Sequence, residues 1–202
     1  MPSALFPLDL RLLRVSRLTP LSARPEAVSH ELVALVLAGT AAAVLTTFVD
    51  FRLGIPGHHI VFVMFPLALG FALVPRRLAG TIMSSSAIAT VAGLGAAGAH
   101  LPGPGVLTGL LLTGPLLDLA LRWGGEGWRL YGAFVAAGAL ANTGAFLARG
   151  IAKYFGLGGL GGGRAFSSWL PVATLTYLVA GMLAGLLSAV AWFRFRSPRA
   201  GS

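Results

Sequence analysis

The chain has 202 residues, of which 56% are hydrophobic and 10% are charged, and it contains no cysteine. A water-soluble domain of this length does not need so much apolar surface to fill its core, so the surplus is expected to face lipid. The absence of cysteine excludes disulfides and thiol chemistry. The net charge of +9 does not indicate nucleic-acid binding, because the arginines stand in small groups beside apolar runs, as topology determinants do.

The amino-terminal segment, residues 1–29, is basic and interrupted by proline. Its arginines interleave with leucines, whereas a cleavable signal peptide has its charges first and an apolar core after them. We expect a cytoplasmic tail that rests on anionic lipid. An Arg-rich organellar targeting segment is the alternative, since the segment has only two acidic residues.

Apolar runs bounded by charges and by Gly/Pro breaks predict an all-α bundle of about six transmembrane helices. A spanning helix needs roughly 20 mostly apolar residues. The predicted transmembrane domain covers residues 30–194 and is followed by a cytoplasmic tail at 195–202. The six predicted spans are 31–49, 57–75, 78–99, 105–121, 130–148 and 168–193.

The basic residues predict the orientation of these spans. With the amino terminus inside, the outer segments hold only Arg52, Arg149, Lys153 and Arg164, and the other 11 of the 15 basic residues fall on the inner side. Cytoplasmic loops carry an excess of Lys and Arg. We therefore expect a multi-pass protein of the cell membrane with both termini in the cytoplasm.

A row of small residues follows one face of the first predicted span. Ala34, Ala38 and Ala42 recur every fourth residue, which forms a ridge that a second helix can approach closely. Lipid gives helices no hydrophobic drive to associate, so such ridges supply much of the packing. The ridge predicts either a docking surface for another subunit or a contact within the same bundle.

Two polar residues within the spans need partners, because polar groups at membrane depth are costly. Asp118 lies four residues before Arg122, and an i, i+4 ion pair is the simple explanation. A role in coupling to a cytoplasmic partner or in proton movement is the alternative. Asn142 lies in the fifth span, where either an interhelical hydrogen bond or a ligand contact would satisfy its amide.

The outer ends of the helices carry the best candidate site. The loop between the first two spans brings an acid, a base and two imidazoles together, and further polar or aromatic residues lie at similar depth. The expected pocket residues are Asp50, Arg52, His58, His59, His100, Asn142 and Trp169.

Three of these residues are histidines, which suit divalent metals. Adjacent residues such as His58 and His59 point to different faces of a helix, so no metal site is predicted. An organic-ligand or lid role and plain interfacial histidines are both consistent with this cluster.

No catalytic or cofactor motif accompanies the site. Residues 156–161 fit the pattern G-x-G-x-x-G, but a dinucleotide fingerprint requires a preceding strand and a following helix, and this stretch joins two spans. The chain has no G-x-S-x-G, H-E-x-x-H or P-loop motif, and its few acidic residues lack paired spacing. We therefore expect neither an enzyme nor a bound cofactor.

These features together resemble the substrate-specific S components of energy-coupling factor (ECF) transporters. The resemblance covers residues 31–193 and rests on six spans with both ends inside, the ridge of small residues, a first outer loop with Gly and Pro, and the turn at Pro75, Arg76 and Arg77. It implies capture of a small molecule from outside, with a transmembrane coupling subunit on the ridge and ATPase subunits as partners. The chain lacks the amino-terminal Met-His motif of the cobalt and nickel members, which disfavours a metal substrate.

Two other classes of function are consistent with the sequence. An accessory subunit of a larger membrane complex would have the same small-residue faces without a ligand pocket. A membrane enzyme acting on a lipid-soluble substrate would use His58, His59, His100 or Asp118, although the missing paired acids disfavour it.

Overall fold

The structure is a computed structural model, and the parts of the chain that it describes are residues 25–49, 57–124, 128–155 and 166–193. At 25–28 and 166–169 only the backbone is described. The described residues form six helices, which are α1 (Pro25–Phe48), α2 (Ile60–Leu73), α3 (Ala79–Ala96), α4 (Pro104–Gly124), α5 (Trp128–Tyr154) and α6 (Phe166–Trp192). Each helix overlaps one predicted span, so the prediction of an all-α bundle of six helices is confirmed.

Five of the six helices are long and apolar enough to cross a membrane, and α2 is shorter. Its 14 residues span about 21 Å, whereas the hydrocarbon core is about 30 Å thick. The predicted span 57–75 is longer than the observed helix. Residues 57–59 form a turn, and the helix ends at Leu73. Nine residues of α2 are buried, so protein rather than lipid surrounds most of this helix, and its length need not match the bilayer.

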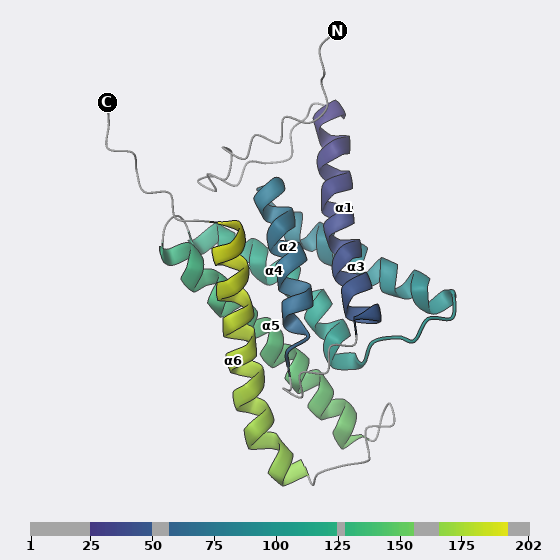
Figure 1. The fold of residues 1–202 in the computed structure, drawn as a ribbon, viewed down its shortest axis with the longest axis vertical. Coiled ribbons are helices and arrows are strands. Elements are labelled where there is room, and N and C mark those ends of the chain that lie inside the picture. Colours follow the sequence, from purple (N-terminus) through teal and green to yellow (C-terminus); the bar gives the residue numbers. More distant parts are fainter. Residues whose placement is uncertain (1–24, 50–56, 125–127, 156–165, 194–202) are drawn as a thin grey trace.

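The helices form a closed ring, and α2 also contacts α3, α4 and α5 across it. Going round, α1 contacts α3, α3 contacts α4, α4 contacts α5, α5 contacts α6, and α2 lies between α6 and α1. Successive helices run in alternating directions, so α1 begins and α6 ends at the same end of the bundle, at the top of Figure 1. We call this the terminal end, and we call the other end, where α2, α4 and α6 begin, the loop end.

Glycines allow the helices to cross at close range. A Cβ atom added to Gly138 in α5 would lie 2.2 Å from the carbonyl oxygen of Gly181 in α6. The same holds for α3 and α4, where a Cβ on Gly80 would lie 2.1 Å from the carbonyl oxygen of Gly114. Backbones that approach this closely gain van der Waals contact, which is the main source of helix association in lipid.

The small-residue ridge of α1 packs inside the bundle. Ala38 and Ala42 are buried, Ala34 is half-buried, and a Cβ on Gly70 of α2 would lie 3.0 Å from the Ala38 Cβ. Contact within the bundle therefore accounts for this ridge. Docking of a coupling subunit on Ala38 and Ala42, which stays a prediction, would require α1 to separate from its neighbours.

Aromatic residues mark both ends of α5. Trp128 at its start and Trp123, just before it at the end of α4, are highly exposed, as are Tyr154 and Phe155 at the loop end. The 27 residues of α5 span about 40 Å, which is the thickness of a bilayer with its headgroups. Aromatic side chains are enriched at membrane interfaces. These residues, with the five long apolar helices, identify a multi-pass membrane protein.

Asp118 caps a neighbouring helix, so the predicted pair with Arg122 is wrong. Its carboxylate accepts hydrogen bonds from the backbone N–H of Gly80 at 2.9 Å, and from the backbone N–H and hydroxyl of Thr81 at 2.8 and 2.7 Å. The first N–H groups of a helix have no partner within it, and a carboxylate also favours the positive end of the helix dipole. Leu78, at the N-cap of α3, makes no side-chain capping bond, so Asp118 supplies the cap from α4.

The predicted tails fall largely outside the described residues. Of the segment 1–29, residues 25–29 belong to α1, and 1–24 lie outside the described ranges. The predicted tail at 195–202 and the glycine-rich segment 156–161 also lie outside them.

Candidate functional site

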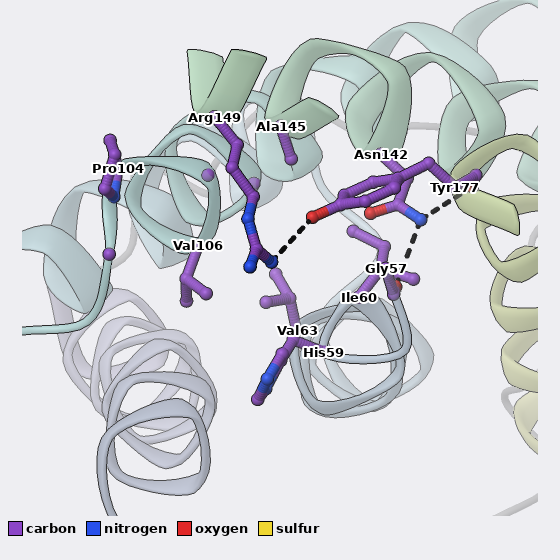
Figure 2. A pocket seen from close by; sticks show the side chains of 13 residues that line it. Gly57, His59, Ile60, Val63, Pro104, Val106, Asn142, Ala145, Arg149 and Tyr177 are labelled. Atoms are coloured by element: carbon purple, nitrogen blue, oxygen red, sulfur yellow. Dashed lines mark hydrogen bonds between the residues drawn. The ribbon is translucent and has the colours of Figure 1, made fainter. Parts of the chain in front are cut away.

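A pocket of about 240 Å³ lies at the loop end of the bundle, between four helices. Figure 2 shows it bounded by the start of α2, the start of α4 and the side chains that α5 and α6 direct toward them. Its polar lining residues are His59, Asn142, Arg149 and Tyr177, and the remainder of the lining is Gly57, Ile60, Val63, Gly103, Pro104, Gly105, Val106, Gly109 and Ala145.

Asn142 joins three of the elements that form the pocket. Its side chain is buried, and its Nδ2 donates to the carbonyl oxygen of Gly57 at 3.1 Å and to that of Tyr177 at 2.7 Å. Both amide hydrogens are therefore used within the protein. The Oδ1 atom points away from these bonds (Figure 2), and no described residue donates to it. Interhelical bonding thus accounts for the nitrogen of this amide, whereas a ligand contact of its oxygen stays a prediction.

Gly57 is the residue that lets α2 begin this close to α5 and α6. Its φ of +87° is a left-handed conformation that side chains disfavour. A Cβ atom there would lie 2.9 Å from Asn142 Nδ2 and 3.0 Å from the Tyr177 Cα. Both the turn and the close contact therefore require glycine, and together they set the position of the next residues, including His59.

Arg149 and Tyr177 form the second polar contact of the pocket. The Arg149 Nη1 donates to the Tyr177 hydroxyl oxygen at 3.2 Å (Figure 2). The Tyr177 ring is buried and packs on Phe146 with ring centroids 5.5 Å apart. Arg149 forms no ion pair with the residues that the structure describes, and none of the described lining residues is acidic.

Neither Arg149 nor Tyr177 was predicted to be a site residue. Arg149 was counted only as an outer basic charge, and Tyr177 lies in an apolar run. The available signal was spacing, because Asn142 and Arg149 are seven residues apart, which places them on one helix face two turns apart. Tyr177 carried no such signal, since nothing in its local sequence separates it from a core aromatic residue.

The structure brings two of the seven predicted residues to the pocket. His59 and Asn142 line it, and His58 does not line it but contacts His59 with ring centroids 4.2 Å apart. His100 is exposed and lies outside the lining.

The side chains of the other three predicted residues are outside the described part of the structure. Asp50 and Arg52 lie outside the described residues. Trp169 is in the first turn of α6, and its side chain is not described.

The donor set of the pocket suits an organic ligand. Within the described ranges, no three His, Asp or Glu side chains gather as metal ligands would. A guanidinium has five N–H donors and no lone pair, so Arg149 recognises acceptors and cannot ligate a cation. The remaining polar atoms are an imidazole, a phenol and an amide oxygen, which fix the orientation of small molecules in mostly apolar pockets.

No protein-family model, curated protein or solved structure matches the chain.

Proposed function

We propose that this chain is the membrane-embedded substrate-binding component of an importer of the ECF type, and that it captures a small molecule in the loop-end pocket. The supporting observation is the pocket itself, in which buried Asn142 holds α2, α5 and α6 around a polar and apolar lining. The resemblance in helix number and in the α2–α3 turn supports the ECF class.

A pocket of this kind favours binding over a purely structural role. Side chains from four helices line the pocket, and its polar groups converge on one mostly apolar space. A role in packing alone does not need such convergence. Here the space is bordered by an arginine and an amide oxygen that the described part of the protein leaves available, which is the arrangement of a ligand site.

Charge supports an outward-facing pocket. The terminal end carries Arg76, Arg77, Arg122 and Arg129, whereas Arg149 and Lys153 are the basic residues of the loop end in the described ranges. Under the positive-inside rule the terminal end lies in the cytoplasm. The pocket then opens toward the exterior, where an importer meets its substrate.

Contacts at the terminal end join α6 to α2 and α5. The Trp192 Nε1 donates to the Phe65 carbonyl oxygen at 3.1 Å, and these two rings are 4.9 Å apart. Phe193 packs on Phe134 at 5.3 Å and accepts a hydrogen bond from the Tyr131 hydroxyl through its carbonyl oxygen. Release into the cytoplasm would require these contacts to break, and ATPase partners would supply the energy. Nothing in this cycle needs covalent chemistry by the chain.

Copurification tests the proposal. A tagged chain, cross-linked in native membranes and then purified, is expected to bring with it a transmembrane coupling subunit and ATPase subunits of the ABC type. An accessory subunit would instead carry the other members of its complex and would gain no thermal stability from small molecules. Recovery without any ATPase would contradict the ECF assignment.

A further inference from the structure

The pocket contains a positive charge that no acidic residue of its described lining balances. The Arg149 guanidinium has five N–H donors, of which one bonds Tyr177 in the described structure. Arg149 is exposed, so solvent partly screens its charge, and its N–H donors supply the specificity for an anion through charge-assisted hydrogen bonds.

Tyr177 extends this anion site. Its hydroxyl oxygen accepts the Arg149 hydrogen bond, so its own hydrogen is available to donate. Donors from α5 and from α6 therefore meet at one point of the pocket. Charge-assisted hydrogen bonds between a guanidinium and a carboxylate are among the strong ones in proteins.

The rest of the lining defines the size and polarity of the ligand body. Ile60 and Val63 of α2 and Val106 of α4 form an apolar wall. The volume of about 240 Å³ is below the range of about 300–1,000 Å³ that is typical of drug-sized ligands. Among the described residues, Arg149 is the one Lys, Arg, Asp or Glu of the lining, so the described lining balances a monoanion rather than a phosphate dianion.

We propose that the pocket binds a small organic carboxylate. Its carboxylate group lies against the Arg149 guanidinium and the Tyr177 hydroxyl, and its short apolar body lies against Ile60 and Val63. Asn142 Oδ1 accepts a hydrogen bond from any donor group on that body. This inference rests on the proposed function only in using the same pocket, because the chemistry of the ligand is a separate claim.

The test measures the unfolding midpoint of the purified full chain in detergent. The probes are sodium butanoate, pentanoate and benzoate, each paired with its neutral amide of nearly equal shape, and inorganic phosphate is added as a separate arm. Sodium chloride keeps the ionic strength constant. The variants are Arg149→Gln, Arg149→Lys and a matched control, Arg122→Gln, which removes an exposed arginine at the terminal end.

The carboxylates are expected to raise the midpoint in a concentration-dependent way, while the amides have no effect. Arg149→Gln is expected to weaken apparent affinity roughly 10- to 100-fold, the range expected for losing a hydrogen bond to a charged group. Arg149→Lys keeps the positive charge but loses the planar guanidinium. Its carboxylate affinity is therefore expected to lie between those of the unsubstituted chain and Arg149→Gln. Arg122→Gln is expected to behave as the unsubstituted chain.

Several results would overturn the inference. These are equal stabilisation by acids and amides, carboxylate binding that survives Arg149→Gln, stronger stabilisation by phosphate than by any carboxylate, or no stabilisation by any probe. The importer proposal fails separately. Arg149-dependent carboxylate binding by a chain that copurifies with no ATPase would support this inference and remove only the ECF assignment.

Discussion

Asn142, in the middle of α5, donates an amide hydrogen to the carbonyl oxygen of Gly57 at 3.1 Å, in the turn from which α2 begins. The second hydrogen of the same amide binds α6 at the Tyr177 carbonyl oxygen. An unpaired amide in an apolar bundle is costly, so these two bonds fix the relative positions of three helices. The width of the pocket therefore depends on one buried side chain.

Replacing Asn142 by leucine keeps the branched shape and the number of side-chain heavy atoms, and it removes both hydrogen bonds. We expect the free energy of unfolding in detergent to fall by about 1–2 kcal/mol, because the Gly57 carbonyl oxygen loses a donor at a buried site. Thr143→Val, at the adjacent position of α5, is the control and is expected to change stability by less than half as much. Equal effects in chemical unfolding of the two variants would show that the amide does not join the helices.

Gly57 and Gly98 allow backbone strain to be separated from crowding. Their φ angles are +87° and +88°, but only Gly57 has neighbours within 4 Å of an added Cβ. At either position, alanine is expected to lower the free energy of unfolding by about 1–2 kcal/mol, because an L-residue disfavours the left-handed backbone conformation. We expect Gly57→Ala to lose about 1–3 kcal/mol more, because its methyl group would press on Asn142 and Tyr177. Thermal unfolding measures both variants, and equal losses would contradict the close contact.

The positions of the helices were predictable because a helix that crosses a bilayer must be both long and apolar. Length and hydropathy in lipid specify where a span lies, so each of the six predicted ranges overlaps an observed helix. The exception is α2, whose ends depend on its neighbours. The length of a helix that is surrounded mostly by protein need not match the thickness of the bilayer. The sequence around Ile60 and Leu73 does not show that other helices surround α2.

The polar contacts were less predictable because their partners are distant in sequence. Asp118 was assigned to Arg122 by local spacing, but it binds Thr81, 37 residues away. Asn142 was recognised as a polar residue in need of partners, yet its partners Gly57 and Tyr177 contribute backbone carbonyl oxygens, which every residue has. Only the folded arrangement selects them.

The cap on α3 gives a test that distinguishes the observed contact from the local pair. We expect Asp118→Ala to lower the free energy of unfolding by about 1–2 kcal/mol, as loss of an N-cap does. Thr81→Val removes one of the three bonds and is expected to cost less. Arg122→Ala is expected to have little effect, since Arg122 is exposed. A double-mutant cycle between Asp118 and Thr81 is expected to be non-additive, and additivity would contradict the contact.

Two glycines of α5 provide a matched test of the α5–α6 crossing. A Cβ on Gly138 would lie 2.2 Å from the Gly181 carbonyl oxygen, whereas a Cβ on Gly132 would meet nothing within 4 Å. We expect Gly138→Ala to destabilise the protein by about 1–3 kcal/mol through overpacking. Gly132→Ala is expected to be neutral or to stabilise by up to about 1 kcal/mol, because alanine favours helix. Unfolding midpoints of the two variants provide the comparison.

The orientation can be measured by labelling, because the chain has no cysteine of its own. Tyr154 at the loop end and Trp123 at the terminal end are both highly exposed, so a cysteine at either position should react with a maleimide once the membrane is permeable. With the terminal end in the cytoplasm, a membrane-impermeant maleimide added to intact cells is expected to label Tyr154→Cys and to spare Trp123→Cys.

Permeabilised cells are the control for this labelling, since both variants should then react to a similar extent. The reverse pattern in intact cells would place the pocket on the cytoplasmic side. Capture from outside would then be impossible for this pocket, and the importer proposal would fail, whereas the carboxylate site would keep its chemistry. Labelling of both positions in intact cells would instead contradict the assignment of these two ends to opposite faces of the membrane.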